Sequence, residues 1–396
     1  MGFVDLFLTD VKSVSPKREC LRNALEQRHV AEFFAGIGLM REGLERQGWK
    51  VVYANDIDPE KKQMYQGHFK DKHSHFVQGD IHKIKADSIP DIALATASFP
   101  CNDLSLAGMR QGLEGKQSSA YWGFVKILEK MKDRRPPLVL LENVAGFLTS
   151  HGGADFAEAL LALNRLGYAV DPMIIDAERF VPQSRVRLFI IASKTLSPAE
   201  EVLESPSFFE DQVRPKALVD FIFAHPEIIW SIRPVPPLPE RTLALTDMLE
   251  DLPNQSPFWW NQERTDYLLQ QMSERHSQQL DKMKKSRKWC YGTVFRRVRK
   301  GRSMAEMRTD GIAGCLRTPR GGSGRQILVK AGYGIVKARL LTPRECARLM
   351  GAENFNIDVP LNQALFGFGD AVCVPVVEWL TQNYLEPLAL ELLNSL

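Results

Sequence analysis

Short apolar runs alternate with amphipathic stretches between about residues 29 and 195. Apolar or alternating runs predict strands, and apolar positions that repeat every three or four residues predict helices. The 136–144 run is almost continuously apolar, which is typical of a strand buried on both faces. Strands that alternate with helices predict a doubly wound, parallel α/β sheet with ligands at its carboxyl edge. The expected strands are 29–36, 50–58, 91–101, 136–144, 173–180 and 186–193, with helices at 39–49 and 121–132.

This regular pattern breaks between about residues 200 and 330, where the chain is rich in proline and aromatic residues. We therefore expect a separate, smaller domain in that region. Helical periodicity returns after Thr342 and Pro343, a pair typical of a helix start, and continues through 374–393. The smaller domain is accordingly predicted to be an insertion, and residues 1–28 to be an N-terminal extension without an assigned role.

The composition is that of a globular protein, since 44% of the 396 residues are hydrophobic and 25% are charged. No stretch approaches the roughly 20 apolar residues of a membrane-spanning helix. The N-terminus is apolar for a few residues and then basic, the reverse of the order in a signal peptide. The six cysteines form no CxxC pair, so we expect no metal cluster. These features predict a cytoplasmic protein.

Positive charge is concentrated in one segment of the chain. The net charge is only +3, yet residues 281–325 contain 5 Lys and 9 Arg against 2 Asp and 1 Glu, a balance of +11. Trp289, Tyr291 and Phe295 are interleaved with these charges. A solvated charged face normally mixes both signs, whereas a basic, aromatic segment is typical of contact with a nucleic acid. We therefore favour a nucleic acid as the partner.

Polar and glycine residues follow the predicted strands where a cofactor would bind. The first strand leads into Phe34-Ala35-Gly36-Ile37-Gly38, where two glycines allow a ligand to approach a helix N-terminus. Arg41 replaces the third glycine of a dinucleotide fingerprint. Asp56 and Asp80 end the next two strands, where a carboxylate can accept hydrogen bonds from ribose hydroxyls, although Asp56 could also serve only the turn before the next helix. Together these strand ends predict a nucleotide-like cofactor.

A second set of strand ends carries candidate catalytic groups. Cys101 follows the 91–101 strand and is placed to act as a nucleophile, although a lone cysteine is more often a small buried hydrophobic residue. Glu142 ends the next strand, where a buried acid can donate a hydrogen bond or a proton. Arg185 and Arg187 alternate along the last strand, so they share a face suited to an anion or a carbonyl group.

These segments, in this order, resemble the motifs of the C5-cytosine methyltransferases. The matching segments are FAGIG (34–38), PCNDLS (100–105), ENV (142–144), QSRVR (183–187), RLLTPRECARLMG (339–351) and GDAVCVPV (369–376). Two positions depart from the family pattern. Asp370 stands where the family usually has Asn, from which we expect altered local hydrogen bonding, and Asn102 replaces the usual Gln after the cysteine.

The resemblance implies a Rossmann-like, S-adenosyl-L-methionine-dependent methyltransferase fold. Residues 29–199 would form the first part of the catalytic domain, 200–334 an inserted target-recognition domain, and 335–396 the part that returns to the catalytic domain. Cys101 would attack C6 of a cytosine flipped out of duplex DNA, and Glu142 would act at N3. Arg185 and Arg187 would contact the cytosine carbonyl and organise the site. The implied role is DNA cytosine-5 methylation in a restriction-modification or phage-defence system.

The resemblance also assigns binding residues and partners. The implied cofactor contacts are Phe34, Gly36, Ile37, Gly38, Asp56, Ile57, Asp80, Ile81, Pro100, Ala371 and Val372. The expected DNA contacts are Ser105, Arg317, Arg320, Arg325, Lys284, Lys285, Arg287 and Lys288. The loop arginines could read guanine edges or clamp phosphates, and both remain open. We expect a monomer that acts on double-stranded DNA, with association to other defence proteins left open.

Three alternatives remain at this point. The first is a C5-cytosine methyltransferase of RNA, which the large basic domain disfavours. The second is a DNA-binding module of the same fold without activity, which the presence of Cys101, Glu142, Arg185 and Arg187 disfavours. The third is a nicotinamide-dependent oxidoreductase, which the missing third glycine and the cysteine at position 101 disfavour.

Overall fold

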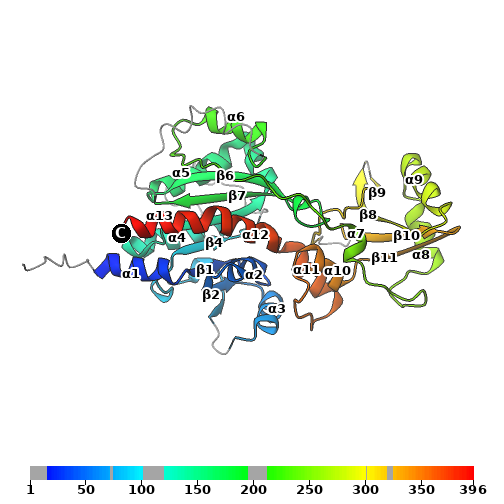
Figure 1. The fold of residues 1–396 in the computed structure, drawn as a ribbon, viewed down its shortest axis with the longest axis horizontal. Coiled ribbons are helices and arrows are strands. Elements are labelled where there is room, and N and C mark those ends of the chain that lie inside the picture. Colours follow the sequence, from blue (N-terminus) through cyan, green and yellow to red (C-terminus); the bar gives the residue numbers. More distant parts are fainter. Residues whose placement is uncertain (1–15, 72–74, 101–119, 195–211, 300, 319–323) are drawn as a thin grey trace, which may run out of the picture.

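The computed structural model describes residues 16–71, 75–100, 120–194, 212–299, 301–318 and 324–396. Within these ranges, a seven-stranded sheet with the order β3-β2-β1-β4-β5-β7-β6 forms the centre of the larger part of the molecule. Helices cover both of its faces (Figure 1), so the predicted α/β fold is confirmed. The strands are β1 (His29–Phe33), β2 (Lys50–Asp56), β3 (Phe76–Gln78), β4 (Leu94–Ala97), β5 (Leu138–Val144), β6 (Ala169–Asp176) and β7 (Val186–Ser193).

One strand departs from the parallel sheet that the sequence pattern predicts. β7 is antiparallel to both of its neighbours, β5 and β6, so the sheet is mixed. The connection from β6 to β7 spans only 177–185, and a crossover that keeps two strands parallel needs a dozen or more residues. The expected strand 173–180 was also misplaced, because β6 begins at Ala169 and ends at Asp176.

The large sheet is buried on both faces because successive side chains of a strand point to opposite sides. In β5, Leu138 and Leu140 belong to one hydrophobic core, and Val139 and Leu141 belong to the other. The first core includes side chains of α1 (Pro16–Glu26), α2 (Leu39–Arg46), α3 (Pro59–Phe69), α12 (Val374–Leu380) and α13 (Glu386–Asn394). The second includes side chains of α4 (Ala120–Met131), α5 (Ala154–Arg165) and α6 (Lys216–Ala224).

A separate antiparallel sheet forms the smaller part of the molecule, at the right of Figure 1. Within the described ranges it has four strands in the order β11-β10-β8-β9. One of its faces packs on α8 (Gln262–Leu269) and α9 (Glu274–Lys284) through Leu268, Leu280, Val294 and Val329. The strands are β8 (Cys290–Arg299), β9 (Arg302–Arg308), β10 (Ile327–Gly332) and β11 (Ile335–Leu340).

Packing divides the chain at different positions from those that the sequence pattern suggests. The pattern breaks at about 200–330 and the resemblance implies an inserted domain at 200–334, but Leu218, Phe221 and Trp230 belong to a core of the large sheet. Arg214 also donates to the buried carboxylate of Asp171 in β6, over 2.7 Å. At the other end, β11 pairs with β10 as far as Leu340. Residues 218–232 therefore pack with the large sheet, although they lie beyond the point where regular periodicity is lost in the sequence.

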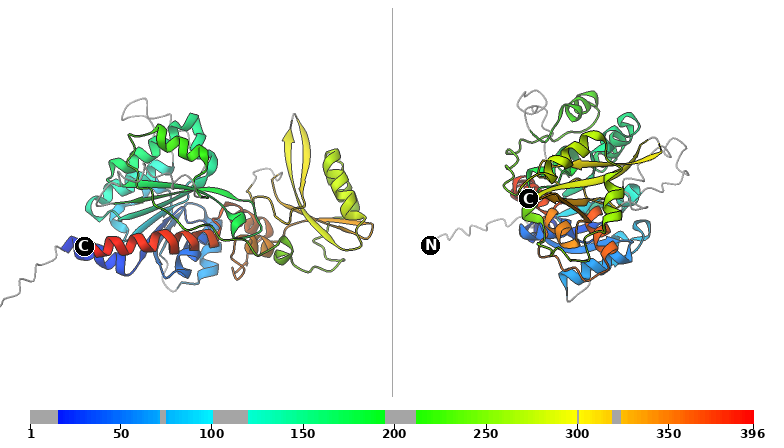
Figure 2. Two further views of the ribbon diagram at one scale, coloured as in Figure 1. Left: turned by 45° about the horizontal axis from the view of Figure 1, so that its top comes forward. Right: turned by 90° about the vertical axis from the view of Figure 1, so that its right-hand side faces the viewer.

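The C-terminal segment returns from the small sheet to the large one. Thr342 caps α10 (Pro343–Leu349) as the Thr-Pro pair predicts: its hydroxyl accepts from Glu345 N, and its own N–H donates to the Glu345 carboxylate over 2.9 Å. α10 and α11 (Leu361–Asp370) lie between the two sheets, close to the short α7 (Leu245–Met248) (Figure 1 and Figure 2). This arrangement brings residues far apart in sequence to one junction.

Among the described residues, one helical run, Leu361–Asn394, is long and apolar enough to cross a membrane by length and composition alone. It has a break between α11 and α12, and 67% of its most apolar window is buried inside the protein. Such burial is typical of the core helices of a globular protein. The run accordingly contributes to the hydrophobic core beneath the large sheet.

Candidate active site at the carboxyl edge of the large sheet

The two glycines of the loop after β1 have different structural roles. Gly36 and Gly38 have φ values of +57° and +87°, a region that favours glycine. A Cβ on Gly38 would lie 2.4 Å from the Phe69 ring and 2.8 Å from the Tyr65 ring, so packing of α3 requires this glycine. A Cβ on Gly36 would have only Phe34 O within reach, at 4.0 Å. Gly36 is therefore the glycine that leaves space for a ligand beside the backbone.

Asp56, at the end of β2, holds this loop in place. Its Oδ2 accepts from Gly36 N over 2.8 Å, and its Oδ1 accepts from Asp58 N over 2.9 Å. The carboxylate is buried, whereas the next side chain, Ile57, is 66% exposed. An apolar side chain thus lies at the surface directly beside the buried carboxylate and the open glycine.

Asp80 follows β3 along the same edge. Its Oδ1 accepts from His82 N over 3.0 Å. Asn55 joins the ends of β2 and β3, because its Nδ2 donates to Val77 O and Gly79 O over 2.9 and 3.0 Å. Side-chain hydrogen bonds thus join the ends of β2 and β3, which the sequence pattern groups together.

Several residues expected to line the cofactor differ in their exposure. Pro100 is exposed, and Phe34 and Ala371 are partly exposed. In contrast, Ile37, Ile81 and Val372 are only 1%, 5% and 4% exposed, and their side chains belong to the hydrophobic cores. Any contribution of these three to a ligand site is through their backbone or through the packing beneath it.

Glu142, at the end of β5, forms an ion pair with Arg187 of β7. Arg187 Nε lies 3.0 Å from Glu142 Oε1, and the two side chains are 15% and 8% exposed. The antiparallel pairing of β5 and β7 places Val144 opposite Arg187, which brings the arginine to the carboxyl end of β5. A carboxylate and a guanidinium group are thus held together in a water-poor position, where charges interact more strongly than in water.

The neighbouring residue, Asn143, connects this pair to the segment that leads to Cys101. Asn143 Nδ2 donates to Phe99 O over 3.1 Å, and Phe99 itself packs against Tyr121 and Phe147. Cys101, like Ser105, lies outside the described residues. The described structure therefore places the start of the Pro100–Cys101 segment beside Glu142.

Arg185 is engaged in a way that the sequence pattern does not reveal. Its guanidinium group is buried and donates to Leu316 O over 2.9 Å, to Gly369 O over 3.2 Å and to Ala371 O over 2.5 Å. These carbonyls come from the segment before β10 and from the end of α11. Arg185 thus fastens two distant segments to the edge of the large sheet.

Gln183 is a site residue that sequence reasoning missed. It is fully buried, its Nε2 donates to Leu349 O over 2.7 Å, and its Oε1 accepts from Leu316 N over 3.0 Å. The backbone of Ser184 also donates to Ala313 O over 2.9 Å. The signal was present in the QSRVR motif, whose first residue forms these contacts.

Comparison with known proteins identifies the family of this chain. The family model described as C-5 cytosine-specific DNA methylase matches residues 29–386. The chain belongs to this family. It is therefore a DNA (cytosine-5-)-methyltransferase, and the family uses S-adenosyl-L-methionine and acts on DNA.

Similar proteins agree with this assignment, and a solved structure has a similar fold. The methylase is 31% identical to the type II methyltransferase M.DsaV of Dactylococcopsis salina over 362 residues, which are 91% of this chain and 86% of that protein. It is 25% identical to M.HhaI of Haemophilus parahaemolyticus over 361 residues, with 89% and 92% of the two chains covered. The fold is similar to that of S. pombe Dnmt2, with a TM-score of 0.57, 19% identity and coverage of 91% and 98%.

Cys315 is a second missed residue of the methylase site. Its Sγ lies 3.5 Å from Arg185 Nη1 and 3.9 Å from Arg187 Nη2. Burial raises the pKa of the Cys315 thiol, but the two guanidinium groups outweigh this effect and hold the net pKa below the ordinary value. Its sequence position, within the basic segment and outside every motif, carried no signal for this location.

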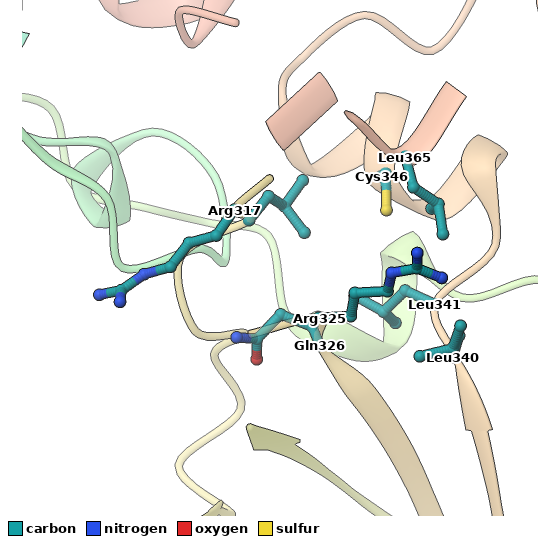
Figure 3. Close-up of a pocket in the computed structure, with 8 residues that line it drawn as sticks. Arg317, Arg325, Gln326, Leu340, Leu341, Cys346 and Leu365 are labelled. Carbon is teal, nitrogen blue, oxygen red and sulfur yellow. The ribbon is translucent and has the colours of Figure 1, made fainter. Parts of the chain in front are cut away.

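Arg317 and Arg325, two expected DNA contacts, lie beside a small hollow between the small sheet and α10 (Figure 3). The Arg317 side chain is exposed and points away from the hollow, whereas Arg325 extends along it, with its guanidinium carbon 5.3 Å from the centre of the Phe366 ring. The third loop arginine, Arg320, lies outside the described residues. The hollow is lined by Leu316, Arg317, Arg325, Gln326, Leu340, Leu341, Cys346 and Leu365.

The other expected DNA contacts, Lys284, Lys285, Arg287 and Lys288, lie at the opposite end of β10. Tyr333 N donates to Ser286 O over 2.8 Å, and Gly334 N donates to Lys284 O over 2.9 Å, so the run borders the β10–β11 turn. β10 extends from Ile327, next to Arg325, to Gly332. Five steps of about 3.3 Å separate its ends by about 17 Å. The structure thus places the two basic groups apart.

Proposed function

We propose that this methylase transfers a methyl group to C5 of a flipped-out cytosine within a specific sequence of duplex DNA. We further propose that it is the modification enzyme of a restriction-modification or phage-defence system, and that it acts in the cytoplasm as a monomer. The observation that carries the proposal is the Glu142–Arg187 ion pair, which lies beside the strand end that leads to Cys101. The relatives named type II methyltransferases support DNA as the substrate.

The proposed chemistry requires a nucleophile and an acid together. Cytosine C5 is a poor nucleophile until another group adds to C6. In our proposal the Cys101 thiolate forms a bond to C6, while Glu142 interacts with N3 and stabilises the developing enamine. C6 is inaccessible inside a base stack, so the cytosine must leave the helix first. Once C5 carries the transferred methyl group, loss of the C5 proton and elimination of the Cys101 thiolate restore the aromatic ring.

The two arginines have separate roles in this proposal. Arg187 orients the Glu142 carboxylate and lies next to the base. Arg185 is a positioning residue, because its donors are directed to Leu316 O, Gly369 O and Ala371 O. It thereby holds the segments that would surround the flipped base and the cofactor.

The residues at the β1 and β2 ends fit S-adenosyl-L-methionine. Gly36 leaves open space, Asp56 retains a second lone pair on each oxygen, and Ile57 presents exposed apolar surface beside them. When bound, the cofactor supplies the methyl group. Asp80 would contribute a second polar group at this edge, and Ala371 would approach it from the end of α11.

A methyl-transfer assay with labelled S-adenosyl-L-methionine tests the proposal on duplex DNA and on tRNA. We expect labelled DNA and no labelled tRNA, and bisulfite sequencing of DNA from an expressing host should show one methylated sequence. Cys101→Ser should abolish transfer while cofactor binding remains, and duplex DNA containing 5-fluorocytosine should trap a covalent complex with the wild type only. Labelled tRNA would favour the RNA alternative, and a wild type that neither methylates nor forms the complex would indicate a silent DNA-binding module.

A further inference from the structure

One ion pair connects the cofactor side of the site to the C-terminal segment. Lys61 Nζ of α3 lies 2.9 Å from the Oδ2 atom of Asp370, the last residue of α11. α3 begins at Pro59, three positions after Asp56, and Asp370 directly precedes Ala371. The pair thus joins the helix that follows the β2 end to the segment that would approach the cofactor from the other side.

The surroundings of Lys61 favour its charged form. Burial lowers the pKa of Lys61, but the carboxylates of Asp370, Asp56 and Asp58 outweigh this effect and raise the net pKa above the ordinary value. The side chains of Lys61 and Asp370 are 25% and 43% exposed. Lys61 is therefore a cation shared between Asp370 and the two carboxylates at the end of β2, so its loss would leave three negative charges close together.

α11 is docked along α3 by further contacts near this pair. Gln363 Nε2 donates to Glu60 O over 3.0 Å. A Cβ on Gly367 would lie 2.8 Å from Met64 Sδ and 2.9 Å from Ile37 Cγ2, which shows that the helices pack closely. These contacts maintain the helix pairing without the ion pair, so loss of the ion pair would act mainly on the end of α11.

The same segment, Phe366–Ala371, also contacts the rest of the site. Arg185 donates to Gly369 O and Ala371 O, and Thr318 Oγ1 donates to Phe366 O over 2.9 Å. Among the described residues, three polar anchors therefore hold this segment: one at α3, one at Arg185 and one before β10. The anchor at α3 joins it to the helix that follows Asp56.

We propose that Lys61 and Asp370 form a positioning pair that sets the C-terminal wall of the S-adenosyl-L-methionine site. The inference rests on the proposed function and adds two residues to it. Because Arg185 keeps its own bonds to Gly369 O and Ala371 O, loss of the pair displaces the wall but leaves the catalytic groups in place. Cofactor affinity then falls, and turnover at saturating cofactor is preserved.

The test measures the Kd for S-adenosyl-L-methionine of the DNA-free protein by calorimetry, and kcat and the KM for the cofactor with saturating duplex DNA, in Lys61→Met, Asp370→Asn and the double variant. We expect the Kd to change in parallel with the KM. We expect Lys61→Met to raise this KM by about threefold to tenfold, as for a partly buried ion pair, with kcat within about twofold. Asp370→Asn should have a smaller effect, because Lys61 retains Asp56 and Asp58. The rise in KM in the double variant should be smaller than the product of the two single rises, as for residues that act together. High salt should reduce the difference from wild type.

Glu378→Gln is a matched control. It breaks a pair of similar exposure, in which Arg46 Nη1 lies 2.8 Å from Glu378 Oε1, and this pair also joins the C-terminal segment to the first part of the chain. We expect its KM for the cofactor to be unchanged. An unchanged KM in Lys61→Met, an equal rise in Glu378→Gln, or fully multiplicative effects in the double variant would overturn the proposal. A wild type that binds no S-adenosyl-L-methionine would overturn the proposed function as well.

Discussion

The carboxyl edge of the large sheet and the face of the small sheet that carries Lys330 hold their charged groups in different ways. At the carboxyl edge, Glu142 is bound by Arg187, and Arg185 donates to three backbone carbonyls. On the small sheet, Lys330 lies over aromatic rings, 4.7 Å from the centre of Trp289 and 6.0 Å from that of Trp259. The first region fixes the directions and distances of its charged groups, whereas the cation of the second lies within about 6 Å of ring centres without one fixed direction.

This difference indicates what each region contributes to the enzyme. Catalysis requires groups held close to one productive geometry, and the bonds at the large sheet provide it. Contact with a phosphate backbone depends mainly on the number of cations and tolerates variation in their position. Substitutions at the carboxyl edge of the large sheet should therefore have large effects on catalysis that depend on the residue replaced. Substitutions of cations on the small sheet should have small effects on DNA binding or stability that add together.

The largest effect is expected at Glu142. Replacement by Gln keeps the size of the side chain but removes the carboxyl group that would serve N3, so single-turnover methyl transfer should fall by about 10²- to 10⁴-fold. Formation of the covalent complex with 5-fluorocytosine DNA should slow in parallel, while binding of S-adenosyl-L-methionine to the free protein should be unchanged. Trapping at the wild-type rate would remove Glu142 from its proposed role.

The junction between the two regions should show the next largest effect. Arg339 of β11 forms two contacts of 2.6 and 2.5 Å with Glu345 of α10, and both side chains are almost fully buried. Arg339→Met would leave the buried Glu345 charge without its partner, which costs about 3–5 kcal/mol of unfolding free energy. Denaturant unfolding measures this loss. Arg339→Lys, which keeps the charge, should recover part of it; equal losses in both variants would argue against a charge effect.

Local sequence patterns predicted the positions of the strand ends, because each depends on neighbouring residues. Asp56, Asp80 and Glu142 follow apolar runs, and the structure places all three at the carboxyl edge of the sheet. The reversal of β7 was not predicted, although the expected strands 173–180 and 186–193 left only residues 181–185 between them, too few for a parallel crossover. The overall alternation of strands and helices was given more weight than this short gap.

Contacts between distant segments could not be predicted in the same way. The sequence does not distinguish Gly36, which faces open space, from Gly38, which faces the Tyr65 ring. Nor does it indicate that Arg185 contacts backbone carbonyls more than 130 positions away. Backbone carbonyls are present in every residue, so they leave no mark in the composition or in a motif.

Substitutions in the basic run 284–288 and at Arg325 test whether effects on DNA binding are the same for all duplexes or specific to one base position. Replacing Lys284, Lys285, Arg287 and Lys288 with Gln should weaken binding to all duplexes alike and flatten the salt dependence by roughly one unit of slope per lost contact. Arg325→Gln, near the catalytic edge, should cost about 1–3 kcal/mol at one base position if it holds a guanine.

Titrations against matched and single-mismatch duplexes at two salt concentrations distinguish these outcomes. A uniform loss in Arg325→Gln would make this arginine a phosphate contact. A loss of affinity confined to one base position in the quadruple variant would show that the basic run reads the DNA sequence and does not only contact phosphates.

The smallest change in unfolding free energy is expected at Lys330, which we compare with Arg339. Both cations lie near the Trp259 ring, Lys330 at 6.0 Å and Arg339 at 5.0 Å. Lys330 lies directly opposite Lys337 in the β10–β11 pair, and like charges in that position repel. Lys330→Met should therefore lose about 0.5–1 kcal/mol of cation–π attraction and regain part of it through relieved repulsion. The unfolding free energy should change by less than about 1 kcal/mol, against about 3–5 kcal/mol for Arg339→Met. Lys330 is half-buried, so a loss above about 2 kcal/mol in Lys330→Met, the range of fully desolvated cation–π contacts, would show that this face of the small sheet is held as firmly as the junction.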